Sequence, residues 1–361
     1  MSQASFDFPL RPIHPPVGWR PPAVTPAHRL TWARAAGAWT ERHSAEPRTA
    51  AHALETIGFE IGRDHAHHGL VPPGSQLVDG HPVRAGWEIG RACFAARTLK
   101  ATPAVRAWLT LRLQAWAAGI DFDACHITPH LIERLHPTHC PITRESLEAL
   151  GQPGSGQVDR MRRENAFEPG NLVTLAARAV EARAGSGFRD AIATVERLES
   201  QRLPEHHGLT APQWARLAIL ESFVTPLPHE EAARLPLLLL PPPRIPVCNP
   251  AQALQVVITA QLTLPGYARR LASLTGRVPS ASARQCLQVF VHTLLARRVA
   301  LGPVGGSALR QGLEDAWRHP LVNQRWQAFA LKMTSAACER LARAAVDGQT
   351  EGGRPQVAWG E

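Results

Sequence analysis

Apolar side chains recur at intervals of three and four residues along most of the chain, which is the spacing of amphipathic helices. Before residue 120, the pattern runs through Trp32 to Trp39, Ala50 to Gly62 and Ala104 to Ala118. These segments are rich in alanine, which favours helices. We therefore expect residues 31–120 to form a helical region.

The second half of the chain carries clear signals for helix starts. Thr210-Ala-Pro-Gln213 combines an N-cap, a proline in the first turn and a capping-box glutamine. Asn249-Pro250 precedes another apolar stretch, and Ser280 precedes a helix that should run to about Ala300. A last helix is expected from Pro320 to about Val346. Residues 186–348 should thus form a second helical region.

The two ends of the chain differ from these regions. Residues 1–30 contain repeated prolines, which favour an extended arm, and residues 349–361 form a polar tail that contains glycine. The longest apolar run, Leu235 to Pro243, is far shorter than the roughly 20 residues that a membrane helix needs. With no secretory leader and six separated cysteines that form no Cys-x-x-Cys, we expect a cytoplasmic protein with reduced thiols and no membrane span.

The pattern changes in residues 121–185. A short helix should start at Thr128-Pro129, followed by a short strand at Cys140-Pro-Ile, a glycine-rich turn from Gly151 to Gly156, an apolar step at Val158 and a helix from Leu172. This order of strand, turn, strand, loop and helix predicts a ββα module. The predicted fold class is mainly α: a multi-helical protein with a small central ββα module.

Three short motifs lie in this central stretch: Cys140-Pro-Ile-Thr143, Val158-Asp-Arg-Met161 and Phe167-Glu-Pro-Gly-Asn-Leu172. In order and spacing, over residues 140–183, they resemble the HNH endonuclease superfamily, also called ββα-metal or His-Me finger nucleases. The flanking sequences GFEIGRDHAHHGL and GWEIGRACF look similar to a group of bacterial proteins that carry this module. The resemblance implies an HNH-like module and metal-assisted hydrolysis of a phosphodiester.

The resemblance also implies roles for particular residues. Asp159 would hold Mg²⁺ or another divalent cation, and Asn171 would be a second ligand or an amide that fixes the loop. Arg160 stands where the family has its general-base histidine, and a guanidinium cannot accept a proton from water. Val180 stands where the closing helix usually offers Asn or His, and Gln157 replaces a small residue. The module is therefore degenerate, and hydrolysis is not expected.

Two interpretations without hydrolysis remain. In the first, Asp159 and Arg160 form an ion pair that fixes the hairpin, and Asn171 caps the following helix. In the second, the module binds nucleic acid without cleaving it, because arginines hold phosphates bidentately. The candidate arginines are Arg160, Arg162 and Arg163.

Histidines and cysteines near the first motif offer further possibilities. His139 is the nearest candidate for a borrowed base in an active, Mg²⁺-dependent endonuclease. The same stretch contains residue types that bind zinc, although it lacks the spacing of a standard zinc site, so polar loop histidines are the alternative. This set consists of Cys125, His126, His130, His136, His139 and Cys140.

A second histidine-rich stretch ends a predicted helix in the first region. Asp64 and His68 should share a face of that helix, which allows a metal site or an acid–base pair. The alternative is that the histidines interact favourably with the dipole at the helix C-terminus.

The net charge of +9 comes almost entirely from arginine, since Lys100 and Lys332 are the only lysines. A basic surface attracts polyanions, so DNA or RNA is the first partner to consider. A compositional preference for arginine is the alternative explanation. We expect a nucleic-acid-binding protein that does not cleave; an active nuclease and a helical protein-interaction or scaffold protein with no nucleic-acid role remain alternatives.

Overall fold

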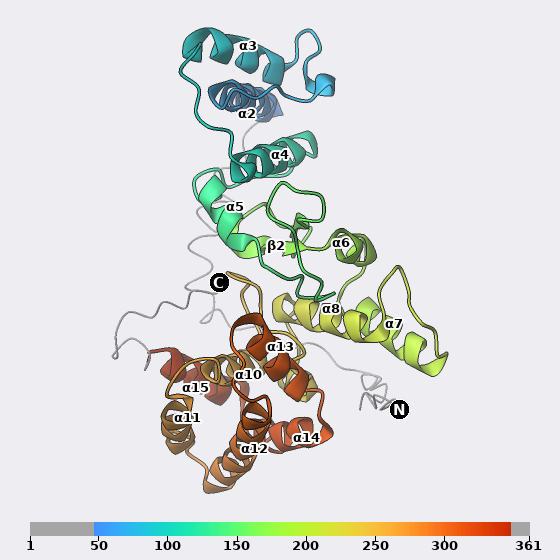
Figure 1. The fold of residues 1–361 in the computed structure, drawn as a ribbon, viewed down its shortest axis with the longest axis vertical. Coiled ribbons are helices and arrows are strands. Elements are labelled where there is room, and N and C mark those ends of the chain that lie inside the picture. Colours follow the sequence, from blue (N-terminus) through green and yellow to red (C-terminus); the bar gives the residue numbers. More distant parts are fainter. Residues whose placement is uncertain (1–46, 348–361) are drawn as a thin grey trace. The chain divides into compact units, whose positions relative to one another are not determined.

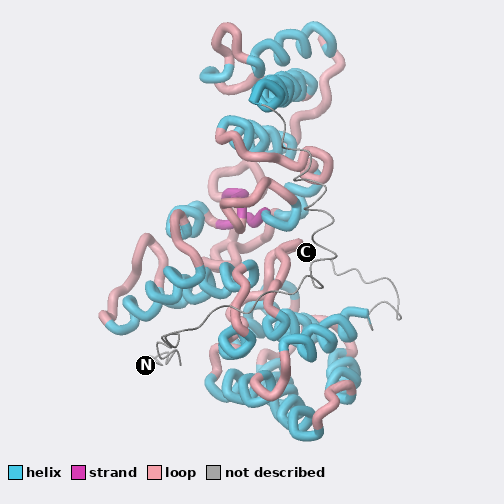
Figure 2. The backbone as a smooth tube through the Cα atoms, turned by 180° about the vertical axis from the view of Figure 1, so that it is seen from behind, coloured by secondary structure: helices cyan, strands magenta, loops and turns pink. Residues whose placement is uncertain are grey.

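The computed structural model describes residues 47–347, which fall into two compact units, the first ending at Asp121 and the second beginning at Phe122. The arm at 1–30, the helix expected at Trp32 to Trp39 and the tail at 349–361 lie outside the described residues. The described chain is mainly helical, as the sequence predicts, with one small antiparallel sheet (Figures 1 and 2). No helix in residues 47–347 is long and apolar enough to cross a membrane.

The helices of the first unit are α2 (Pro47–His67), α3 (Pro82–Phe94) and α4 (Pro103–Ala117). The second unit contains α5 (Pro129–Leu135), α6 (Ala177–Arg183), α7 (Phe188–Ser200), α8 (Ala211–Val224), α9 (His229–Arg234), α10 (Pro250–Gln261), α11 (Tyr267–Gly276), α12 (Ala281–Ala300), α13 (Gly306–Ala316), α14 (Pro320–Ala330) and α15 (Ser335–Asp347). Its strands are β1 (Gln157–Arg160) and β2 (Leu172–Leu175), and short 3-10 turns lie at Gly74–Gln76 and Pro169–Asn171.

In the first unit, α2 and α3 pack with their backbones in contact. A Cβ added to Gly62 would lie 1.9 Å from the carbonyl oxygen of Val83, and one added to Gly86 would lie 1.9 Å from the carbonyl oxygen of Phe59. Each glycine belongs to a Gly-x-Glu-Ile-Gly sequence, one on each helix. This pairing therefore admits no side chain at either position.

In the second unit, β1 and β2 pair antiparallel with Asp159 opposite Val173. In the described chain these two strands form the only sheet, drawn in magenta in Figure 2. Gly156, which precedes β1, has a φ of +80°, and a Cβ there would lie 2.8 Å from the carbonyl oxygen of Leu175. Glycine is therefore needed for the chain to enter the sheet at this point.

In this region the helix start at Thr128-Pro129 and the strand at Val158 are confirmed, but the other strand and the last helix were misplaced. Cys140-Pro-Ile enters a turn instead of a strand, with one isolated bridge between His139 and Ser146. Leu172 begins β2 instead of a helix, and α6 starts only at Ala177. All four residues of β2 are buried, so its apolar run fits a strand covered on both faces, a pattern that is hard to distinguish from a buried helix.

The helices of the second unit pack around buried aromatic rings. Phe290, Trp317, Trp326 and Phe329 are fully buried, and neighbouring ring centroids lie 5.3 to 5.7 Å apart. Such offset and edge-to-face pairs add to the stability gained by burying the rings. These side chains form the core of the last six helices, residues 248–347, which we call the C-terminal basic bundle.

The predicted helix starts at Ala211, Pro250 and Ala281 are confirmed. The single helix expected from Pro320 to Val346 was wrong, because α14 ends at Ala330 and α15 begins at Ser335. The hydroxyl of Thr334 accepts a hydrogen bond from the backbone N–H of Ala337, at 3.2 Å. Thr334 thus caps the new helix, and the apolar periodicity conceals the break.

Two arginines connect the turn after Cys140 to neighbouring helices of the second unit. Arg144, at a φ of +62°, donates to Asp315 at 2.7 Å and to Glu314 at 3.3 Å, both near the end of α13. Arg216 of α8 donates to the carbonyl oxygen of Ile142 at 2.6 Å, and burial lowers its pKa to about 10. The central region and the helices around it are therefore joined by polar contacts, of which the one from Arg216 to Ile142 is buried.

Candidate functional site

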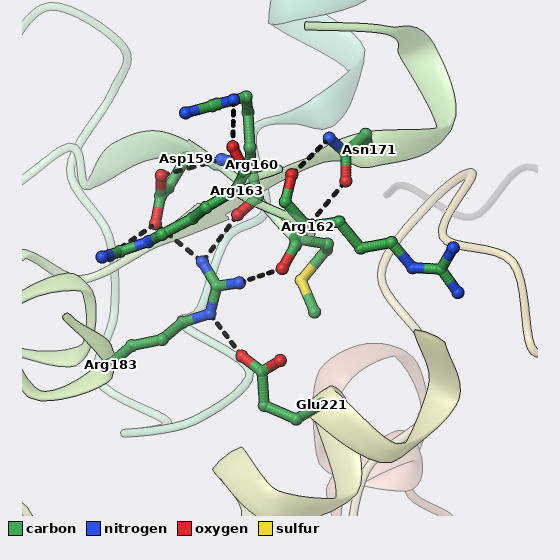
Figure 3. Close-up of polar contacts among 8 residues, drawn as sticks. Asp159, Arg160, Arg162, Arg163, Asn171, Arg183 and Glu221 are labelled. Atoms are coloured by element: carbon green, nitrogen blue, oxygen red, sulfur yellow. Dashed lines mark hydrogen bonds and ion pairs between the residues drawn. The ribbon is translucent and has the colours of Figure 1, made fainter. Parts of the chain in front are cut away.

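Asp159, the predicted metal carboxylate, lies on β1 and faces arginines. One carboxylate oxygen accepts from the backbone N–H of Arg160 at 2.8 Å, and the other accepts from Nη1 of Arg183 at 2.7 Å (Figure 3). Arg163 lies 3.6 Å from the second oxygen. Both oxygens are therefore already engaged in hydrogen bonds or ion pairs.

The centre of this cluster is Arg183, at the end of α6. Its side chain is only 3% exposed, and it donates to Asp159, to the carbonyl oxygens of Arg160 and Met161, and to Glu221 of α8 (Figure 3). Burial raises the pKa of Glu221, against the opposing effect of Arg183. One guanidinium thus ties together β1, the loop after it and α8, and we call this group the Asp159 cluster.

Asn171 is 3% exposed and fixes the loop between the strands. Its side-chain oxygen accepts from the backbone N–H of Arg162 at 2.7 Å, and its amide donates to the carbonyl oxygen of Arg162 at 2.9 Å (Figure 3). The amide also donates to the carbonyl oxygen of Ala166 at 3.0 Å. This is the loop-fixing role considered from the sequence. The expected helix cap at Asn171 was wrong, because the residue precedes β2.

The three arginines predicted to bind nucleic acid differ in how far they are free to do so. Arg160 donates to the carbonyl oxygens of Arg163 and Asn165, both at 2.6 Å, and lies 4.8 Å over the ring of Phe167. Arg162 donates to the carbonyl oxygen of Val224. Arg163 has a side chain that is 44% exposed, and its partner is Asp159. Arg163 is therefore the most available of the three.

The ion pair expected between Asp159 and Arg160 was wrong, because each of the two side chains has other partners. Arg160 gives Asp159 its backbone N–H, while its guanidinium turns to the loop. The ionic partners of Asp159 are Arg183 and Arg163. A divalent cation at Asp159 would have to displace Arg183 or share the carboxylate with it, against the repulsion of the surrounding positive charge.

The cysteines and histidines proposed as zinc ligands make separate contacts. His126 bonds to Asp123 at 2.8 Å, His136 to the carbonyl oxygen of Glu148 at 2.9 Å and His139 to the hydroxyl of Thr138 at 3.0 Å. Cys140 is buried, and its sulfur accepts from the N–H of Ala176, while Cys125 and His130 are exposed. Across residues 47–347, no three His, Cys, Asp or Glu side chains are grouped to hold a metal ion.

The other titratable pair singled out from the sequence lies at the end of α2. Asp64 forms an ion pair with Arg112 of α4, whose side chain is 6% exposed. Burial lowers the pKa of His68, with a smaller contribution from His67. Arg112 thus gives Asp64 a structural partner within the first unit.

The residues that sequence reasoning missed are Arg183 and Glu221. Arg183 lies three residues after Val180, the position compared with the family's ligand, and Glu221 lies in the apolar helix α8. A buried arginine and its distant carboxylate carry no local sequence signal, because they lie 38 residues apart. Only the folded chain brings them together.

The charge distribution did carry a signal that sequence reasoning overlooked. Residues 122–247, which contain the Asp159 cluster, have 13 basic and 15 acidic side chains. The C-terminal basic bundle has 12 basic and four acidic ones, and no Asp or Glu occurs from residue 232 to 313. Most of the net charge of +9 therefore lies in the bundle.

Comparisons with known proteins add no family to this description. No family model matches the chain, and neither a curated protein nor a solved structure is significantly similar to it.

Proposed function

We propose that this protein binds DNA or RNA through the C-terminal basic bundle and does not cleave it. The observation that carries the proposal is the excess of 12 basic over four acidic side chains in residues 248–347. Lysine and arginine attract the phosphate backbone without regard to sequence, because bound phosphates release their counterions. The HNH-like resemblance of residues 140–183 agrees with a nucleic-acid partner.

The contacts of Asp159 support the proposal that the protein does not cleave. A hydrolytic HNH-like site needs a carboxylate that is free to hold a cation and a base that titrates near neutral pH. The carboxylate of Asp159 is held by Arg183, and the adjacent Arg160 is a guanidinium. His139 is bonded to Thr138. We propose that the central module is a structural support for the C-terminal basic bundle, whose helices bind the nucleic acid.

Binding is tested by titrating the protein into labelled DNA and RNA at salt concentrations from about 50 to 200 mM. The proposal predicts that log K falls linearly with log salt for at least one of the two. A flat plot would remove the polyanion partner and favour the helical scaffold protein. The slope of this plot indicates how many phosphates are contacted, since each contacted phosphate of duplex DNA contributes about 0.9 to its magnitude.

Cleavage is tested with supercoiled plasmid in the presence of Mg²⁺ or Mn²⁺. We expect no nicking by the purified chain, since Asp159 is engaged by Arg183. Nicking that disappears in Asp159→Ala would establish the nuclease instead. Nicking that survives the substitution would come from a contaminant.

A further inference from the structure

A surface hollow of about 310 Å³ lies between α12 and α14 of the C-terminal basic bundle. This volume falls at the small end of ligand-binding pockets, which span about 300 to 1,000 Å³. Two guanidinium groups, an imidazole and a hydroxyl line it, together with two methyl side chains. The lining residues are His292, Thr293, Ala296, Arg297, Ala300 and Arg325.

No carboxylate from either helix balances this positive charge. The segments that form α12 and α14 contain neither Asp nor Glu. Elsewhere in the bundle, Glu314 and Asp315 pair with Arg144, and Glu339 pairs with Arg343. In the part of the chain that the structure describes, the guanidinium of Arg297 makes no hydrogen bond or ion pair, while its backbone carbonyl accepts from the N–H of Leu301. The hollow is therefore a concentration of uncompensated positive charge.

One of the two guanidinium groups is held in place by a hydroxyl. Nη1 of Arg325 donates to Oγ1 of Thr293, and that hydroxyl donates in turn to the carbonyl oxygen of Val289 at 2.7 Å. Thr293 is 9% exposed, so its position is fixed by packing. Arg325 is thus oriented before any ligand arrives, which reduces the entropy lost on binding.

The charge of Arg297 also acts on His319, the N-cap residue of α14. The ring of His319 accepts a hydrogen bond from the N–H of Leu321 and so caps this helix. Burial lowers the pKa of His319, and the positive charge of Arg297 lowers it further. An anion bound in the hollow would offset the same positive charge.

We infer that the hollow between α12 and α14 is a binding site for a phosphate group, held by Arg297 and Arg325. A guanidinium presents parallel N–H donors that match two oxygens of a phosphate, and two such groups in a small space favour an oxyanion over a neutral ligand. The phosphate can belong to a nucleic-acid backbone or to a free phosphorylated ligand. In the first case the inference rests on the proposed function.

The nucleic-acid source is tested with two matched single substitutions in the full chain. Arg297→Gln removes a charge from the hollow, and Arg269→Gln removes an exposed charge that has no hydrogen bond or ion pair within residues 47–347. Neither change removes a side-chain hydrogen bond or ion pair of the described residues. We expect the first to weaken binding of a labelled oligonucleotide about tenfold, and the second about threefold at most.

The outcomes of this test separate the two proposals. Equal losses in both variants would overturn the phosphate site while leaving diffuse binding by the bundle intact. No binding by the unmodified protein would overturn the proposed function. The site would then have to bind a free phosphorylated ligand, and this is tested with inorganic phosphate alone.

That second test follows the Nε–H signals of the arginine side chains by NMR during a titration with inorganic phosphate, with chloride keeping the ionic strength constant. We expect saturable shifts for Arg297 and Arg325 and none for Arg269. A tenfold loss of oligonucleotide binding without these shifts assigns the site to backbone phosphate. Unchanged signals combined with equal losses in the two variants would overturn the site for both sources.

Discussion

The Asp159 cluster and the hollow between α12 and α14 both contain arginines, and they use them in opposite ways. In the cluster, Arg183 is 3% exposed and donates to two carboxylates and two carbonyl oxygens. In the hollow, the guanidinium of Arg297 is without a partner in the described residues, and Arg325 is held by a neutral hydroxyl. A guanidinium that is already satisfied stabilises the fold, while an unsatisfied one remains able to bind an anion.

The largest effect should come from replacing the arginine at the centre of the Asp159 cluster. Arg183→Met removes the ionic partner of Glu221 and the closer of the two partners of Asp159, and breaking a buried pair costs about 3 to 5 kcal/mol. Urea unfolding of the second unit should show a loss in that range. The matched control is Arg178→Met, whose exposed pair with Glu145 contributes at most about 1 kcal/mol. Equal, small losses in the two variants would show that the cluster is not structural.

A somewhat smaller effect is expected at Asn171. Asn171→Ala removes one acceptor and two donors from the loop and leaves the part-buried N–H of Arg162 without its bond, at a cost of about 2 to 3 kcal/mol. The measurement is again the free energy of unfolding. If stability were unchanged while Mg²⁺-dependent nicking were lost, Asn171 would be a metal ligand instead.

Replacing Arg163 should have little effect on either the stability of the fold or the binding of nucleic acid. It is 44% exposed and 3.6 Å from Asp159, so Arg163→Gln is expected to change the free energy of unfolding by less than about 1 kcal/mol. Oligonucleotide affinity should fall far less than in Arg297→Gln. A tenfold loss of affinity in Arg163→Gln would show that the binding surface includes the central module, against the structural account of the Asp159 cluster.

The smallest expected effect is that of Mg²⁺ on stability. A cation that binds only the folded chain raises its stability in proportion to the logarithm of concentration over Kd. Because Arg183 and Arg163 already neutralise Asp159, we expect the thermal midpoint to be the same in millimolar Mg²⁺ and in chelator. A rise in the midpoint that is lost in Asp159→Asn would reveal a metal site.

The sequence was most informative where local patterns determine structure. The capping signals at Thr210 and Ser280 gave correct helix starts, and the mainly helical class followed from apolar spacing. Leu172 to Leu175 was misplaced because a short buried strand and a buried helix share the same apolar run. The position of β2 depends on pairing with β1, which no local pattern specifies.

The candidate site depended even more on contacts between distant residues. Asp159 and Asn171 could be singled out by their motifs, but their partners could not, since Arg183 is 24 residues from Asp159 and Glu221 is 38 from Arg183. The hollow between α12 and α14 combines residues from two helices in the same way. The charge of Arg297, by contrast, was visible in the sequence, because this residue lies in the long stretch from 232 to 313 that has no carboxylates.

The central claim is that the positive charge available to nucleic acid lies in the C-terminal basic bundle and not around Asp159. The most direct measurement compares the salt dependence of oligonucleotide binding in two triple variants of equal net charge. One replaces Arg269, Arg297 and Arg340 with Gln, and the other replaces Arg134, Arg197 and Arg202, which are exposed arginines of residues 122–247. We predict that the slope of log K against log salt becomes shallower by about one or more in the first variant and stays unchanged in the second. A shallower slope in the second variant alone would contradict the claim.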